Sequence, residues 1–121
     1  MTLDGLDRAI ARAHSNLLAT QLPDGRWRGR CNMGVLYGSM TILVEHFLGV
    51  LSDEDRIELA RHVRGQQRPD GSFPSHPMAA RGDFDATCFA LAALLVAGAR
   101  EGDPEIVAAR RSVEAGGGLG K

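Results

Sequence analysis

A seven-residue pattern occurs twice in this chain and limits what the chain can fold into. Residues 21–27 read QLPDGRW, and residues 67–73, 46 positions further along, read QRPDGSF. The matching pairs are Gln21/Gln67, Pro23/Pro69, Asp24/Asp70, Gly25/Gly71 and Trp27/Phe73. A repeat at this spacing indicates one supersecondary unit that is used twice, with each copy too small to bury its own apolar face.

Each copy predicts the end of a helix followed by a tight turn. Proline presets φ, aspartate hydrogen-bonds to nearby backbone and glycine adopts a positive φ, so the chain reverses direction there. We expect the side-chain amide of Gln21 or Gln67 to bond to backbone groups around its turn. We expect the aromatic residue, Trp27 or Phe73, to pack back over the start of a helix.

The rest of the sequence predicts an all-α protein of about five helices. Alanine, leucine and arginine are frequent, and no run alternates β-branched with polar residues. Cap and stop signals place the helices at about residues 2–20, 33–48, 52–66, 83–97 and 103–115. In the third helix we expect Ile57, Ala60 and Val63 to face inward and the charged residues to face solvent.

Two of the expected helices carry extended apolar patterns. In the second, apolar side chains recur with helical spacing, which is typical of a core-facing stripe. The stripe consists of Met33, Leu36, Tyr37, Met40, Leu43, Val44 and Phe47. The fourth helix has no polar face, so we expect it to be buried on every side.

Composition and charge exclude several classes of protein. The 121 residues include 14 basic and 15 acidic residues, a net charge of −1, and no basic run that would favour nucleic acid. No segment approaches the roughly 18 apolar residues of a membrane span, and the polar start is unlike a secretory signal.

Cys31 and Cys88 form no Cys-x-x-Cys pattern, so we interpret them as reduced thiols in a cytoplasmic protein. Peripheral contact with a membrane stays open.

The repeated pattern Gln-x-x-x-Gly-x-Trp is similar to the QW motif of squalene–hopene cyclases and the wider class II terpene cyclase superfamily. The order of features along the chain also resembles the amino-terminal stretch of that family. An opening helix with LDRA at residues 6–9 leads to the first turn, DFDAT at residues 83–87 heads an apolar helix, and three glycines follow at 116–118. The resemblance covers nearly the whole chain.

This resemblance implies a partial α/α toroid. Residues 1–22 would be a first helix of the catalytic β domain, and residues 23–121 would form part of the γ domain. In this family the inner helices line an apolar cavity, so part of the apolar stripe of the second helix could face a ligand instead of the core. Five helices cannot close such a ring, and an open repeat leaves apolar faces uncovered.

The resemblance also implies a candidate catalytic segment. Class II cyclases protonate an alkene or epoxide with the middle acid of an Asp-x-Asp-Asp motif, whose neighbouring carboxylate tunes the pKa of that acid. Here Ala86 takes the fourth position, and two interpretations stay open. Either Asp83 and Asp85 cap the fourth helix with help from Thr87, or Asp85 is the proton donor of a degenerate motif that includes Asp83. A metal-binding Asp-x-Asp has less support, because no class I aspartate-rich motif accompanies it.

Our leading hypothesis is the amino-terminal segment of a class II terpene cyclase that acts on squalene or a polyprenyl diphosphate. The segment would be architectural and inactive alone, and its partners would be the isoprenoid substrate and the remainder of the cyclase chain or a second subunit. We expect no cofactor and no metal, except Mg²⁺ if the substrate is a diphosphate.

The alternative is a non-catalytic helical-repeat module that docks on a partner chain through its open apolar face. A toroid prenyltransferase-type subunit has the least support, because it needs a zinc set of Asp, Cys and His, and Asp83 and Cys88 lack a companion histidine.

Overall fold

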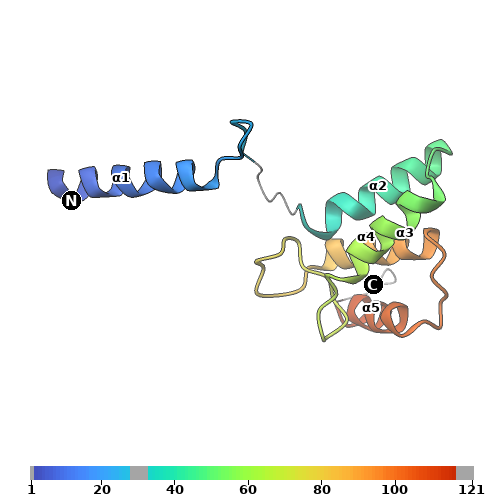
Figure 1. The fold of residues 1–121 in the computed structure, drawn as a ribbon. Coiled ribbons are helices and arrows are strands. Elements are labelled where there is room, and N and C mark those ends of the chain that lie inside the picture. The colour runs from blue at the N-terminus through green and yellow to red at the C-terminus, as the bar shows by residue number, and fades with distance from the viewer. Residues whose placement is uncertain (1, 28–32, 117–121) are drawn as a thin grey trace. The chain divides into compact units, whose positions relative to one another are not determined.

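The structure, a computed structural model, describes residues 2–27 and 33–116. These residues form five α-helices and no strand beyond two isolated bridges, which confirms the predicted all-α fold (Figure 1). The chain divides into two compact units, Met1–Cys31 and Asn32–Lys121. The first repeat turn thus groups with the helix that precedes it. The assignment of residues 1–22 and 23–121 to β-type and γ-type domains stays a prediction.

The first unit contains one helix, α1 (Leu3–Thr20), and the turn after it. Thr2 caps this helix, because its hydroxyl oxygen accepts a hydrogen bond from the Gly5 amide at 3.2 Å. No residue of α1 is buried, and the large side chains of its apolar face are exposed. In proteins most of the stability of a helix comes from the packing of its apolar face. The described residues of the first unit therefore leave the apolar face of α1 uncovered.

The second unit contains α2 (Gly34–Leu48), α3 (Asp53–Arg64), α4 (Phe84–Val96) and α5 (Pro104–Ala115). Helix α4 contacts each of the other three, and α3 also packs on α2 (Figure 1). The two strongly apolar helices, α2 and α4, are therefore neighbours, and each has a helix of mixed polarity as a further neighbour. This is the arrangement expected for a segment of a two-layered α/α repeat.

Local capping chemistry explains why the helix starts agree with the predicted ones. Ser52 Oγ accepts a hydrogen bond from the Asp55 amide at 3.1 Å, and Asp83 Oδ1 accepts one from the Ala86 amide at 2.8 Å. Pro104 takes the first position of α5, where a helix needs no N–H donor.

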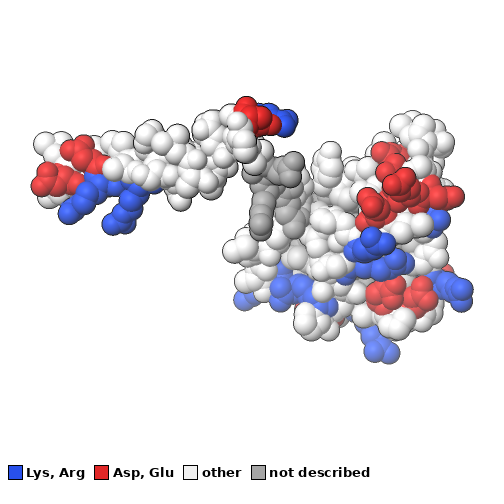
Figure 2. Space-filling model, in the orientation of Figure 1, with Lys and Arg blue, Asp and Glu red and all other residues white. Residues whose placement is uncertain are grey.

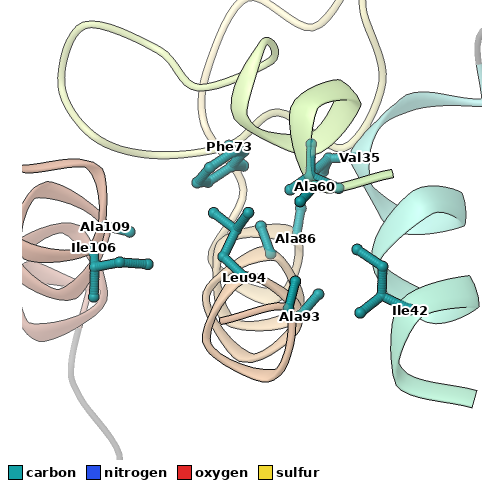
Figure 3. Close-up of a cluster of buried hydrophobic side chains, with 12 residues drawn as sticks. Val35, Ile42, Ala60, Phe73, Ala86, Ala93, Leu94, Ile106 and Ala109 are labelled. Atoms are coloured by element: carbon teal, nitrogen blue, oxygen red, sulfur yellow. The ribbon is translucent and has the colours of Figure 1, made fainter. Parts of the chain in front are cut away.

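The core of the second unit lies around α4 (Figure 3). Its fully buried side chains are Val35, Ile42, Val63, Phe73, Ala86, Ala90, Ala93, Leu94, Ile106 and Ala109. The alanines of α4 allow its neighbours to approach closely. Phe73, from the second repeat turn, lies over Leu94 and Ala86 in Figure 3. The second turn thus contributes its aromatic residue to the core.

The prediction that the apolar stripe of α2 faces the core is wrong. The buried residues of α2 are Gly34, Val35, Gly38, Ser39 and Ile42, which lie on a different face. Of the predicted stripe, Leu36 and Leu43 are partly buried and the other five residues are exposed, with Phe47 at 89%. The physical reason is close approach: a Cβ on Gly38 would already lie 3.3 Å from the side chains of His62 and Val63. The face with small residues packs, and the face with large residues stays open.

Helix α4 is also less buried than its sequence predicts. Phe84 and Phe89 are each 39% exposed, and Ala92 is exposed. In α3, Ala60 and Val63 are buried as expected, but Ile57 is 50% exposed. No helix in the described ranges combines the length and apolar character needed to cross a bilayer.

Candidate functional site

The two repeat turns, residues 21–27 and 67–73, share one set of hydrogen bonds. In each, the glutamine amide donates to the carbonyl of the turn glycine, at 2.7 Å in the first turn and 3.0 Å in the second. The backbone bonds also match in position: Leu22 N–H to Arg26 O and Arg68 N–H to Ser72 O are both 2.8 Å. The glycines have nearly identical φ angles, +87° at Gly25 and +86° at Gly71. The two copies are therefore the same structural unit.

The second turn is bound to the start of α5. Gln67 Nε2 donates to the carbonyl of Glu105 at 2.9 Å as well as to its own turn. Gly71 lies against the backbone of Ala108, so that an added Cβ would stand only 2.4 Å from the Ala108 oxygen. Arg64 forms an ion pair with Glu105 at 3.0 Å. One glutamine and one glycine thus fix the first turns of a helix that begins more than 30 residues away.

The first turn packs against its own helix instead. The indole N–H of Trp27 donates to the carbonyl of Leu17 at 2.7 Å, in the last turn of α1. Within the first unit Trp27 thus contacts the end of a helix, and its expected packing over the start of a helix stays a prediction. Trp27 stays 52% exposed, whereas Phe73 is completely buried. The aromatic residue of the turn is therefore buried in the second unit and exposed in the first.

The aspartate of each turn is held as a charged hydrogen-bond acceptor. The hydrogen bond from the Arg26 side chain, followed by the one from the Arg26 amide, keeps the pKa of Asp24 below its ordinary value. For Asp70 the Ser72 hydroxyl has the largest effect on the pKa, followed by the Ser72 amide, and both lower it. The two turns therefore share their backbone geometry but use different side chains to secure the aspartate.

Asp83 acts as the N-cap of α4. In addition to its bond with the Ala86 amide, its own N–H donates to the carbonyl of Phe73 at 2.8 Å. The Thr87 hydroxyl donates to the carbonyl of Asp83 at 2.6 Å and accepts from the Phe73 amide at 3.0 Å. Asp83 also borders a hollow of about 380 Å³ that Arg68 lines as well. These contacts tie the second turn to the start of α4.

Asp85 lies on the open side of α4 and is exposed. It borders a hollow of about 250 Å³ whose other lining residues are Leu43, Cys88, Phe89 and Ala92. Burial raises the pKa of the Cys88 thiol, and the negative charge of Asp85 raises it further. The structure thus separates the two candidate catalytic carboxylates: Asp83 faces the second turn, and Asp85 faces the apolar hollow between α2 and α4.

The other sequence candidates for special chemistry lie apart from this region or outside the described residues. Cys88 is a half-buried free thiol, and Cys31 falls in a range that the structure does not describe. His76 is exposed, and its Nδ1 accepts a hydrogen bond from the Met78 amide. Within residues 2–27 and 33–116, no group of three or more histidine, cysteine or acidic residues is arranged to hold a metal ion. In Figure 2 the acidic and basic residues of the second unit are intermixed on the visible face.

Sequence reasoning missed the contact between the second turn and α5. The bond from Gln67 to Glu105 and the approach of Gly71 to Ala108 join segments that no local pattern connects. One signal was present in the sequence: α5 has alanines at 108 and 109, where a bulkier residue would hinder close packing.

Comparison with known proteins gives two matches. Residues 10–121 match the family model of the squalene-hopene cyclase N-terminal domain. The chain is also 29% identical, over 113 residues, to the enfumafungin synthase of Hormonema carpetanum. This match covers 93% of the present chain but only 8% of that protein. No solved structure matches the chain significantly.

The family match extends over most of the chain, including both repeat turns and all of α2 to α5. It agrees with an all-α fold in which two apolar helices pack together and two helices of mixed polarity pack against them. The chain therefore belongs to the squalene-hopene cyclase N-terminal domain family.

Proposed function

We propose that this chain is the amino-terminal segment of a class II terpene cyclase, and that its role there is architectural. The substrate would be an isoprenoid such as squalene or a polyprenyl diphosphate. In this proposal α2 and α4 supply part of an apolar wall, and the catalytic acid belongs to another part of the complete enzyme. The observation that carries the proposal is the open apolar surface of α2 and α4 in a chain of this family.

The open surface has the character that an isoprenoid cavity needs. Phe89 and Ala92 of α4 line the 250 Å³ hollow together with Leu43 of α2. The exposed aromatic residues Tyr37 and Phe47 extend the apolar surface along α2. Apolar side chains and aromatic faces suit a substrate made of branched hydrocarbon and the carbocations formed from it.

The surroundings of the two aspartates support an architectural role over a catalytic one. A class II acid needs a second carboxylate and a dry site to tune its pKa. Asp83 is committed to the cap of α4 through the Ala86 amide. Asp85 is exposed, and the neighbouring fourth position is alanine. Neither aspartate has the paired and buried setting of a proton donor in the described residues.

The test is a comparison of cyclisation in the natural gene product and in the isolated 121-residue chain. Each protein is incubated with squalene or with a polyprenyl diphosphate and Mg²⁺, and cyclic products are measured by gas chromatography and mass spectrometry. We expect product from the natural gene product and none from the isolated chain. Cyclisation by the isolated chain would refute the architectural role, and absence of product from both would refute the cyclase assignment.

A second comparison tests the assignment of Asp85. In the natural gene product, Asp85→Asn is expected to retain cyclisation, because the side chain keeps its size and only its acidity is lost. A loss of product by several orders of magnitude, with the folded state unchanged by circular dichroism, would instead make Asp85 the proton donor.

A further inference from the structure

The hollow of about 380 Å³ beside the second repeat turn combines two cationic side chains with an apolar wall. Arg68 and Arg81 line it together with Ser112, which carries a hydroxyl group. Phe84 and Val113 supply the apolar part of the wall. All of these residues belong to the second unit, Asn32–Lys121. The volume of the hollow is within the usual range of small-molecule sites, about 300–1,000 Å³.

Arg68 has only long polar contacts for a charged side chain. Its Nε atom is buried and has no hydrogen-bond partner among the described residues. Asp70 Oδ1 lies 4.0 Å from this Nε, and Nη1 of Arg68 lies 3.5 Å from the carbonyl oxygen of Ala79. Strong hydrogen bonds of this kind are about 2.7–3.2 Å long. A buried charged donor without a close acceptor costs free energy, so an acceptor in the hollow would stabilise Arg68.

Two carboxylates also border the hollow, and each is held by hydrogen-bond donors of its own. Asp70 Oδ1 accepts from the Ser72 hydroxyl at 2.6 Å and from the Ser72 amide at 3.0 Å. Asp83 Oδ1 accepts from the Ala86 amide at 2.8 Å. These carboxylates offset part of the positive charge of the hollow, so an anion should bind there with moderate affinity.

We propose that this hollow binds a small organic oxyanion, which is a phosphate or carboxylate group on a compact apolar body. The guanidinium groups of Arg68 and Arg81 would donate to the oxyanion, because the planar fork of arginine matches both phosphate and carboxylate. Phe84 and Val113 would contact the apolar body. The hollow shares no lining residue with the apolar hollow that Asp85 borders, so the inference does not rest on the proposed function.

Phenyl phosphate and benzoate are the probes, because each joins an oxyanion to one aromatic ring. Each is added to the isotope-labelled 121-residue chain, and the Nε–H signals of the arginine side chains are followed by nuclear magnetic resonance. The signal of Arg68 is the one that is missing in Arg68→Lys. We expect this signal to shift and saturate with a Kd on the order of 1 mM, because a new acceptor on the guanidinium changes its environment. Benzyl alcohol, which keeps the ring without the charge, should cause no shift at the same concentration.

Four variants and a matched control identify the site, with affinities taken from the phosphorus signal of phenyl phosphate. Arg68→Gln and Arg81→Gln should each weaken binding at least about tenfold, because each removes charge-assisted donors. Arg68→Lys keeps the charge without the fork, so its affinity should lie between those of Arg68→Gln and the unchanged chain. Asp70→Asn should tighten binding, because it removes an opposing charge and the long ion pair of Arg68. Arg100→Gln is the control, because Arg100 is exposed and does not line the hollow.

Circular dichroism checks that each variant is folded. Arg81 is exposed, so Arg81→Gln keeps the test decisive if a variant of Arg68 does not fold. The terminal carboxylate of the chain is another oxyanion, so the titration is repeated with a glycine–serine tail added after Lys121. We expect the same affinity with and without the tail. Binding only with the tail would make the chain's own carboxylate the ligand, and would overturn the assignment of a small molecule.

Three other results would contradict the proposal. The first is the absence of a saturable shift with either probe up to a concentration on the order of 10 mM. The second is an equal loss of affinity in Arg81→Gln and Arg100→Gln, which would mean that the probe is attracted by positive charge in general. The third is an equal response to benzyl alcohol, which would make the hollow an apolar site without a role for its arginines.

Discussion

The contact between Gly71 and α5 predicts an unusually large effect for a small substitution. Gly71→Ala has two separate costs. At φ +86° an alanine is in the left-handed region, which costs about 1–2 kcal/mol. Its Cβ would also lie 2.4 Å from the Ala108 oxygen and 2.8 Å from the Ala108 Cβ. Backbone cannot move aside as the end of a flexible side chain can, so we add about 1–3 kcal/mol for overpacking.

The expected total is about 2–5 kcal/mol of unfolding free energy, the sum of those two ranges. Gly49→Ala is the matched control, because Gly49 has φ +72° in the same unit and no atom within 4 Å of its added Cβ. Gly49→Ala should lose only the cost of the left-handed backbone conformation, about 1–2 kcal/mol of unfolding free energy. The difference between the two variants isolates the packing contribution.

Urea denaturation followed by circular dichroism at 222 nm gives both free energies. In a thermal scan each kcal/mol corresponds to roughly 4–8 °C for a unit of this size. Equal losses in Gly71→Ala and Gly49→Ala would refute the claim that the second turn is packed against the α5 backbone.

Three further predictions concern the second turn and the start of α4. Thr87→Val should cost about 1–3 kcal/mol in urea denaturation, because it leaves the buried Phe73 amide without its acceptor; a change under 0.5 kcal/mol would contradict this role. Asp83→Ala should cost about 0.5–2 kcal/mol as a lost N-cap, and Asp85→Ala clearly less, so a reversed order in the same assay would show that the cap is misassigned. The lowered pKa of Asp70 means that its stabilising contribution is present above the ordinary aspartate pKa of 3.8 and is lost as pH falls through the folded-state value. Asp70→Asn should therefore make the acid limb of a stability–pH curve shallower, and an unchanged curve would count against the Ser72 hydrogen bonds.

Sequence reasoning succeeded where the chemistry is local. The Pro-Asp-Gly pattern predicts both turns because each residue acts on its own backbone. The starts of α3, α4 and α5 follow from Ser52, Asp83 and Pro104, whose caps need only the next few residues. These elements could be placed from the sequence to within one or two residues.

Sequence reasoning failed where packing partners decide the outcome. Helix α2 is apolar on two faces, and periodicity identifies apolar faces without saying which of them has a partner. The small residues Gly38 and Ser39 allow close packing, and the large stripe that includes Tyr37 and Phe47 stays open. The apolar character of α4 likewise predicts burial on every side, but it does not say which sides have a packing partner among the described residues.

In the candidate site, too, local features could be predicted from the sequence and contacts between distant segments could not. That Asp83 could cap α4 was readable from its position before an apolar helix. Asp85 faces an apolar hollow shared with Leu43. This position depends on how α2 packs on α4, and no local sequence pattern encodes that packing. The second acceptor of Gln67 is equally non-local, because Glu105 lies 38 residues away.

The proposed function makes this chain one open part of a larger helical enzyme. Native mass spectrometry of the gene product purified from its source is a direct test. We predict a species several times heavier than 13.0 kDa, either as one long chain or as a complex with a larger partner. A stable, folded monomer of 13.0 kDa would contradict the claim and favour a small binding module that docks through the open faces of α2 and α4.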